Sequence, residues 1–190
     1  SDPKTAKSNK YGEGKYLTAI QYLAPGNLSG VMNTCPMASA GCLAACLHTA
    51  GNPVYLEAKT KARITRTKMY AKDRDAYKAQ LIKEVTAFVR KAVKQGSTPC
   101  VRLNGTSDIV WERVFPELFA MFPHVQFYDY TAISARLGND WKLPVNYHLT
   151  FSRKEQNHVA VSDVVAKTSG NVAVVFSGCG ISAHPKPFPA

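Results

Sequence analysis

The chain has 190 residues, of which 45% are hydrophobic and 19% charged, a composition that indicates one folded domain and excludes a disordered chain. No window is long and apolar enough to cross a membrane, and no apolar run follows the amino-terminal lysines as a secretory signal requires. The net charge of +11 is concentrated in residues 1–95, where 16 Lys and Arg stand against 6 Asp and Glu. A basic half favours polyanions such as nucleic acids as partners, although a solvated face with no partner has the same composition.

Periodicity and turn residues predict alternating strands and helices. In chain order, we expect a flexible arm at 1–14, a strand at 15–22, helices at 53–70 and 73–96, a strand at 100–103, a helix at 111–122, strands at 125–130 and 147–151, a helix at 159–168 and a strand at 172–176. Asp73 is the expected cap of the second helix, and Gly96 its stop.

Strands that alternate with helices indicate an α/β fold with a parallel sheet and right-handed crossovers. We expect residues 15–190 to form a single α/β domain that holds an iron-sulfur cluster, with the βα repeats curled into a small partial barrel. Ligands of such sheets bind beyond the carboxyl ends of the strands. The loops expected there carry the polar residues of this sequence, so function is expected at that rim.

Three of the five cysteines lie close together in residues 33–48, here called the cysteine segment. Cys42 and Cys46, four residues apart, would share one helix face, and Pro36 and Gly41 allow Cys35 to fold back toward them. Because the chain shows no export signal, we expect the cytoplasm, where thiols stay reduced. Soft thiolates suit iron-sulfur clusters, so the segment predicts a 4Fe-4S cluster on Cys35, Cys42 and Cys46.

Two other interpretations of the cysteines stay open. Zinc held with His48 or a distant ligand is one, although the paired CxxC or His spacing of structural zinc sites is absent. Inert buried cysteines are the other. Cys100 opens an apolar strand and is expected to be a buried structural thiol, whereas Cys179 follows the last strand, where a fourth cluster ligand would stand.

Five stretches of the chain resemble the phage gene product 88 domain family over about residues 15–176. They are NTCPMASAGCLAACLHTAG, RITRTKMYAKDRDAY, RLNGTSDIVWE, FYDYTAIS and HLTFSRKEQN. This resemblance implies phage origin and metal binding.

The layout of a cysteine triplet after the first strand is also similar to radical S-adenosylmethionine (SAM) enzymes, although their CxxxCxxC spacing is not matched. That similarity implies a partial barrel and a cluster with one iron open to SAM. By placement alone, it assigns contacts with SAM to Asn104, Thr106, Asp108, Ser152 and Arg153. A structural role stays equally open for two of these positions, since Asp108 could cap the helix that begins near Val110 and Asn104 could form a turn with Gly105.

The leading hypothesis is therefore a phage iron-sulfur protein of the host cytoplasm with a radical-SAM-like fold, which binds SAM or another small molecule at its cluster. The sequence leaves open whether it is an enzyme, and the lack of phosphate-binding GxxxxGK and nucleophile GxSxG patterns argues against nucleoside triphosphatases and hydrolases. The alternative is a basic nucleic-acid-binding module whose cluster or zinc is only structural. Its expected phosphate contacts are Lys59, Arg63, Arg66 and Lys68.

Overall fold

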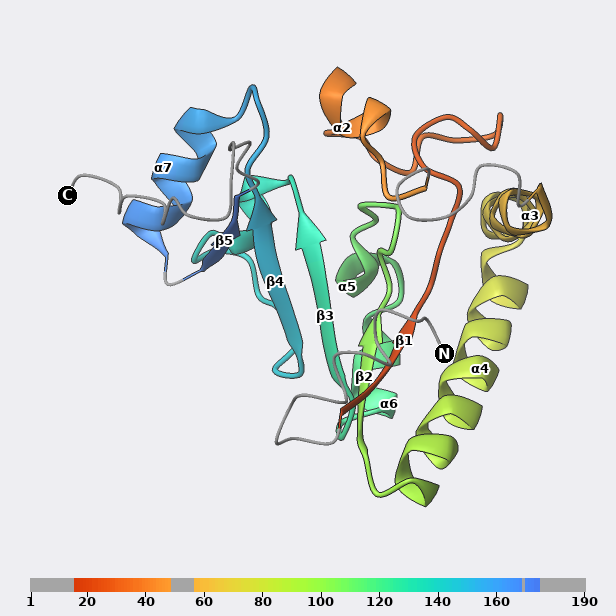
Figure 1. Cartoon of the computed structure of the whole chain (residues 1–190). Coiled ribbons are helices and arrows are strands. Elements are labelled where there is room, and N and C mark those ends of the chain that lie inside the picture. The colour runs from red at the N-terminus through yellow and green to blue at the C-terminus, as the bar shows by residue number, and fades with distance from the viewer. Residues whose placement is uncertain (1–15, 49–56, 169, 175–190) are drawn as a thin grey trace, which may run out of the picture.

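The computed structural model describes residues 16–48, 57–168 and 170–174, and shows a parallel sheet with helices packed against it (Figure 1). The expected arm at 1–14 and Cys179 lie outside these residues. The strands are β1 (Tyr16–Ile20), β2 (Thr98–Arg102), β3 (Gln126–Thr131), β4 (Tyr147–Ser152) and β5 (Asn171–Ala173). The helices are α2 (Ala40–Ala44), α3 (Glu57–Lys72), α4 (Arg74–Lys94), α5 (Trp111–Val114), α6 (Pro116–Met121), the 3₁₀ helix η1 (Ser134–Leu137) and α7 (His158–Lys167).

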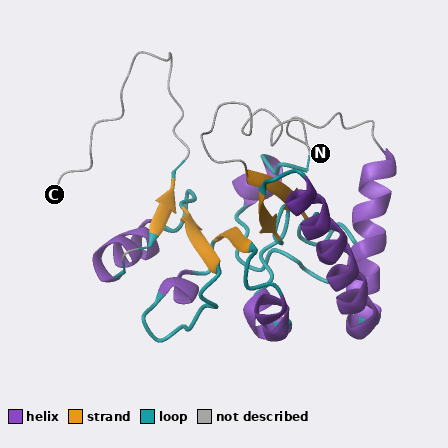
Figure 2. Ribbon diagram, turned by 90° about the horizontal axis from the view of Figure 1, so that it is seen from below, coloured by secondary structure: helices purple, strands orange, loops and turns teal. Residues whose placement is uncertain are grey.

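The sheet keeps the strands in chain order, β1-β2-β3-β4-β5, and every pairing is parallel. The connecting helices lie along one side of a curved row of strands, as crossovers of a single hand require (Figure 2). The α/β class and the parallel sheet are thus confirmed, while the partial barrel remains a prediction. All carboxyl ends point to the same edge, which Figure 1 shows at the top together with α2.

Helix boundaries agree with the sequence where capping chemistry fixes them. Asp73 caps α4 by accepting a hydrogen bond from the Ala76 amide at 2.9 Å, and Gly96 ends the helix with φ +62°. The helix expected at 111–122 is instead two short helices. Phe115 separates them with a non-helical backbone at φ −136° and ψ 66°, because the helical conformation is disfavoured for a residue that precedes proline. The amino end of the first long helix and the end of the last strand fall partly outside the described residues.

The hydrophobic core lies between the sheet and its helices. Tyr70, Tyr77, Trp111 and Phe115 pack as one aromatic group, with ring centroids 5.2 to 6.4 Å apart. Trp111 is fully buried, and Phe127 of β3, Leu149 of β4 and Leu103, directly after β2, belong to the same cluster. This core fixes where the strands end, and hence where the rim loops lie.

Candidate metal centre

The cysteine segment follows β1 and arches over the carboxyl ends of the strands. Its short helix α2 begins at Ser39, whose hydroxyl accepts a hydrogen bond from the Cys42 amide at 3.1 Å. The helix ends at Ala44, and Cys46 lies on the turn that follows, where its amide donates to the Leu43 carbonyl at 3.4 Å. Cys42 and Cys46 are therefore near one another in sequence but do not both belong to one helix, which corrects the expectation of a shared helix face.

Cys35 is held against the loop that follows β2. Its amide donates to the Asn33 side chain at 2.9 Å, and its thiol donates to the Thr106 carbonyl at 3.5 Å. Burial raises the pKa of the Cys35 thiol, hydrogen bonds from the Gly26 backbone and the Thr34 side chain oppose this rise, and the Cys46 side chain adds to it. The convergence of Cys35 with Cys42 and Cys46 on one centre stays a prediction.

All three cysteines of the segment are half-buried. Within the described ranges, no three His, Cys, Asp or Glu side chains stand close enough together to hold a single metal ion. Three thiols are the kind of soft donor that iron-sulfur clusters take, and none of the three is fully buried. Cys100, in contrast, is a buried thiol in β2, as expected.

The imidazole of His48 is hydrogen-bonded to Arg63 and is therefore not available as a metal ligand. Its Nδ1 atom accepts a hydrogen bond from a guanidinium nitrogen of Arg63, and because arginine can only donate, the imidazole is neutral with its proton on Nε2. Burial, and secondly the nearby Arg63 charge, lowers the pKa of His48. Neither ring nitrogen then offers a lone pair to zinc, which argues against the zinc interpretation that included His48.

The loop after β4 fastens the cysteine segment from the other side. The Glu155 carboxylate accepts a hydrogen bond from the Gly41 amide at 3.0 Å, and the Lys154 ammonium donates to the Met37 carbonyl at 3.1 Å. A Cβ atom at Gly41 would stand only 2.7 Å from that carboxylate oxygen, so a larger residue there would force the Glu155 side chain to shift. No sequence pattern indicates that Glu155 and Lys154 reach the cysteine segment, because their contacts span more than a hundred residues.

Asn104 and Thr106 were expected to contact a ligand, but their side chains hold the loop after β2. Asn104 is 1% exposed, and its Oδ1 atom accepts hydrogen bonds from the Ser107 hydroxyl, the Ile109 amide and the Trp111 indole, all within 3.0 Å. The Thr106 hydroxyl donates to the Leu23 carbonyl at 2.6 Å. With these polar atoms engaged, neither side chain is placed to contact a ligand.

Asp108 belongs to a buried group of charges, here called the Arg136 network, which consists of Asp108, Glu112, Asp129, Arg136 and Tyr147. Arg136 is fully buried, donates to Glu112 at 2.9 and 2.7 Å through two nitrogens, and donates to Asp108 at 3.1 Å. The other Asp108 oxygen accepts from the Ala132 amide at 2.8 Å. Burial raises the pKa of Asp108 despite these partners. Both carboxylate oxygens are therefore engaged, although Asp108 lies close enough to influence Cys35.

Ser152 and Arg153 lie at the carboxyl end of β4, on the predicted rim. Both are half-buried. The Ser152 carbonyl accepts a hydrogen bond from Asn157 at 3.0 Å, and the Arg153 amide donates to the Ala173 carbonyl at 2.9 Å. The Arg153 guanidinium contacts a ring nitrogen of His158 at 3.4 Å. The two residues thus lie on the predicted rim, and their contact with a small molecule stays a prediction.

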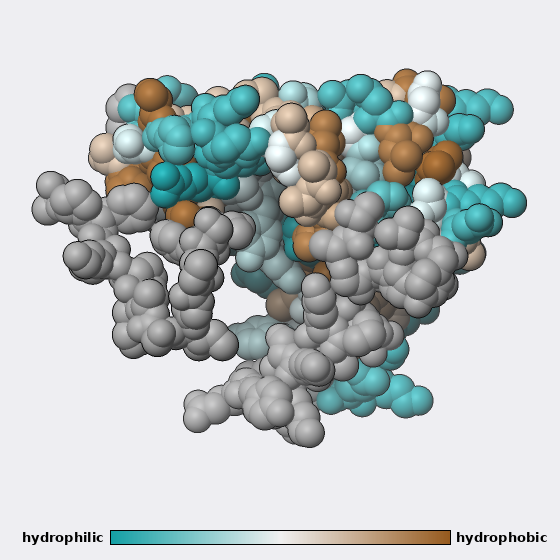
Figure 3. Space-filling view, turned by 45° about the horizontal axis from the view of Figure 1, so that its top comes forward, coloured by the Kyte–Doolittle hydropathy of each residue, from teal (hydrophilic) through white to brown (hydrophobic). Residues whose placement is uncertain are grey.

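The rim also carries apolar side chains. In the cysteine segment Met37, Leu43 and Leu47 are between 47% and 57% exposed. Figure 3, which turns this end of the molecule toward the viewer, shows hydrophobic side chains scattered among hydrophilic ones. The cysteines thus lie in a surface of mixed polarity.

The basic residues predicted to contact phosphates do not form one stripe. Arg63 is only 5% exposed, whereas Lys59, Arg66 and Lys68 are on the surface. The outward face of α3 instead presents Lys61, Lys68 and Lys72, which are exposed and spaced seven and four residues apart. Sequence reasoning missed Lys61 and Lys72, although the helical period marks them once the buried face is known.

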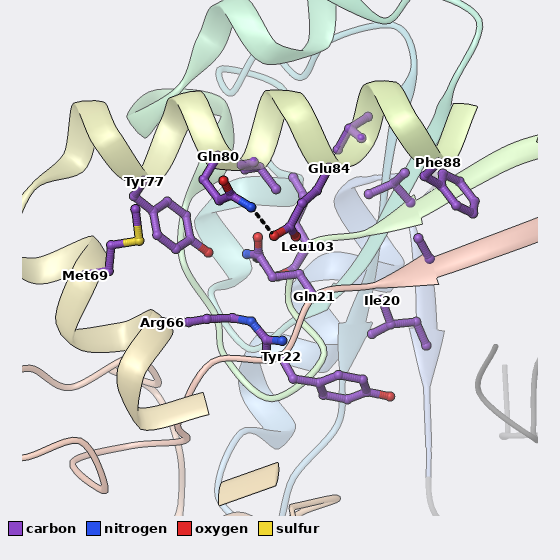
Figure 4. A pocket seen from close by; sticks show the side chains of 14 residues that line it. Ile20, Gln21, Tyr22, Arg66, Met69, Tyr77, Gln80, Glu84, Phe88 and Leu103 are labelled. Carbon is purple, nitrogen blue, oxygen red and sulfur yellow. Dashed lines mark hydrogen bonds between the residues drawn. The ribbon is translucent and has the colours of Figure 1, made fainter. Parts of the chain in front are cut away.

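A pocket of about 190 Å³ lies between β1, α3 and α4 (Figure 4). Apolar side chains such as Leu81, Val85 and Phe88 line it, and Arg66 reaches it from α3. Two of its polar groups bind each other, since the Gln80 amide donates to Glu84 at 2.8 Å. The pocket contains none of the cysteines and is smaller than most ligand sites.

Comparison with known families places the whole sequence in one of them. The model of the family described as Gene product 88 matches residues 1–185. The chain belongs to the gene product 88 family. No curated protein and no solved structure matches it. The phage resemblance seen in the sequence is thus confirmed, whereas the similarity in layout to radical SAM enzymes finds no support.

Membership of the gene product 88 family does not by itself identify a ligand or a reaction. The helices in the described ranges include none that is long and apolar enough to span a bilayer. What this gene product 88 chain binds therefore depends on its residues at the carboxyl ends of the strands.

Proposed function

We propose that this gene product 88 chain binds a 4Fe-4S cluster through Cys35, Cys42 and Cys46 at the carboxyl ends of its strands. The observation that carries the proposal is that three half-buried thiols lie in one segment, and that one of them, Cys46, is linked through His48 to the buried cation Arg63. Thiolates are the usual ligands of such clusters, and a nearby positive charge favours the anionic centre that they form. In the reducing cytoplasm of a host cell, where we place the protein, the thiols stay available for iron.

The cluster, when bound, would supply either electron transfer or a Lewis-acidic iron for a small molecule. The chain's own residues limit the second role. The more specific hypothesis is that SAM binds at an open iron. Asn104 and Thr106 would not contribute to such a site, because their polar atoms are hydrogen-bonded within the loop after β2 and to the Leu23 carbonyl. Ser152 and Arg153 then remain as its candidate contacts, and Glu155 and Lys154 keep the cysteine segment beside them.

The test is anaerobic purification from iron-replete cells, followed by iron and sulfide analysis. We expect about four irons per chain, as for a cuboidal cluster. Replacement of Cys35, Cys42 or Cys46 by Ala should each remove the iron. Cys100→Ala is the matched control, because this thiol is buried in β2, and it should leave the iron content unchanged. Stoichiometric zinc without iron in the wild-type protein would contradict the proposal.

A second candidate function, nucleic-acid binding, is favoured by the lysine stripe Lys61, Lys68 and Lys72 on α3. These three lysines are exposed, and Glu57 is the only acidic residue of that helix. Clustered lysines bind polyanions by releasing condensed counterions, a mechanism that needs no defined pocket. This function and cluster binding are compatible, since the stripe and the cysteines use different residues.

A further inference from the structure

Arg63 is a buried cation with no carboxylate partner among the residues that the structure describes. Its side chain projects from α3, and the residue is 5% exposed. None of the ion pairs within the described ranges includes it. Its guanidinium lies over the Tyr22 ring, 4.8 Å from the centroid, and donates to the neutral imidazole of His48. Neither of these two partners carries a negative charge.

Such a cation is costly to bury unless an anion is close, because desolvation of an unpaired charge costs several kcal/mol. Burial indeed lowers the pKa of Arg63, while Tyr22 and Cys46 act in the opposite direction. An arginine nevertheless stays protonated in proteins. His48, which binds Arg63 through its ring, also donates its backbone amide to the Cys46 sulfur at 3.5 Å, so the thiol that can offset the Arg63 charge is Cys46, a ligand of the proposed cluster.

The contrast with Arg136 shows what is unusual. Arg136 is even more deeply buried, but it is neutralised by two carboxylates, Glu112 at 2.7 Å and Asp108 at 3.1 Å. Within the described ranges no carboxylate pairs with Arg63, and the cysteine segment is where a negative charge for it can form. His48 and Tyr22 fix its orientation, so the charge is held in place before any metal arrives.

We propose that Arg63 is the fixed counter-charge of the cluster held by Cys35, Cys42 and Cys46, and that it raises the reduction potential of this cluster. The inference rests on the proposed cluster binding. Reduction adds one electron to the cluster and makes no bond, so the complex becomes more negative by one charge. A positive charge beside Cys46 stabilises the reduced form more than the oxidised form, and its removal must therefore lower the potential.

The experiment compares iron content and midpoint potential in four proteins, titrated with dithionite under anaerobic conditions: wild type, Arg63→Gln, Arg63→Lys and Arg90→Gln. Arg90→Gln is the matched control, since it removes the same charge from an exposed position on α4. We expect Arg63→Gln to reduce the ratio of reduced to oxidised cluster about tenfold at a given potential, a downward shift of about 59 mV for a one-electron couple. Arg63→Lys, which keeps the charge, and Arg90→Gln should stay near the wild-type potential.

The remaining outcomes also decide the question. If Arg63→Gln loses its iron while Arg63→Lys retains iron at the wild-type potential, the requirement for charge is supported. If Arg63→Gln keeps its iron and the wild-type potential, or if both Arg63 variants lose their iron, a role as counter-charge is overturned. Wild-type protein without iron would instead refute the proposed function itself, an outcome that the iron analysis separates from the others.

Discussion

Two polar regions lie at the carboxyl ends of the strands, the Arg136 network and the cysteine segment. In the network, Arg136, Glu112 and Asp129 are all less than 8% exposed, and hydrogen bonds within the fold engage their charged groups. In the cysteine segment the thiols are half-buried, and Met37, Leu43 and Leu47 are exposed. A polar group that is already satisfied supports the fold, whereas one left accessible can bind something else.

The comparison assigns different roles to residues that looked equivalent in the sequence. Asp108 and Asn104 have their polar atoms engaged by the protein, so they shape the rim rather than bind a ligand. The cysteine segment is held by contacts with two residues of the loop after β4, Lys154 and Glu155, and by the Thr106 carbonyl. Substitutions can test this assignment: changes in the Arg136 network should affect stability, and changes in the cysteine segment should affect metal binding.

The largest expected effect is that of Glu112→Ala, which leaves Arg136 buried without its two-nitrogen contact. Breaking a buried ion pair in this way typically costs about 3–5 kcal/mol, because the remaining charge is no longer compensated. Denaturant unfolding of the metal-free protein measures this cost. Glu117→Ala is the control, since its ion pair with Lys78 is equally short at 2.7 Å but lies on the surface, where it should contribute little. Equal, small effects of both variants would refute a structural role for the network.

Asn104→Ala is expected to have the next largest effect. The Ser107 hydroxyl, the Ile109 amide and the Trp111 indole would lose their shared acceptor. Buried donors without partners should lower the free energy of unfolding by about 1–3 kcal/mol. Iron per folded chain should stay at the wild-type level, whereas Cys42→Ala should lose iron with little change in the stability of the metal-free protein. A stable Asn104→Ala protein that lacks iron would show that the two regions are not separate.

The sequence was sufficient for features with a local cause. Alternation of strands and helices predicted the parallel sheet, and Asp73 and Gly96 predicted the limits of α4, because capping depends on neighbouring residues. In each of these cases, the residues that determine the structure are close in sequence.

Features with distant partners could not be predicted in the same way. Asn104, Thr106 and Asp108 have the composition of a ligand-binding loop, and only the fold shows that Trp111, Leu23 and Arg136 engage their polar atoms. Arg63 appeared to belong to a basic face, because sequence spacing does not reveal which side of α3 meets Tyr22 and His48. The long-range contact of Glu155 with Gly41 had no signal in the sequence either.

A smaller, pH-dependent effect should come from Asp129 in the network. Burial raises the pKa of this carboxyl to about 7, although the Asn104 amide and the Tyr147 hydroxyl donate to it. The folded protein then keeps a proton that the unfolded chain has lost, so stability falls as pH rises from the ordinary range of an aspartate toward 7. The slope contributed is at most about 1.4 kcal/mol per pH unit.

Asp129→Asn should remove this slope, because an amide does not titrate. Denaturant midpoints of wild type and variant, measured between about pH 4 and pH 8, give the difference in stability across the window in which the group changes charge. The wild type should lose stability relative to the variant as pH rises. Parallel curves would mean that Asp129 is ionised in the folded protein throughout, and that the network holds one more negative charge than we infer.

The smallest effect on the fold, and the one that tests the surface rather than the rim, concerns the lysine stripe of α3. Replacing Lys61, Lys68 and Lys72 by Glu should leave the stability and iron content almost unchanged, since all three side chains are exposed. If these lysines bind phosphates, affinity for duplex DNA should fall, and the slope of log K against log salt should flatten by about 0.9 for each lysine–phosphate pair that is removed.

Lys83, Arg90 and Lys94 provide a control on α4 with the same spacing and exposure. Reversal of their charges changes the net charge equally, so an equal loss of affinity in both variants would show that DNA responds only to the overall charge. A loss confined to the α3 variant would establish this stripe as a specific surface, and would mean that phosphate binding and the cysteine centre are carried by different faces of one small domain.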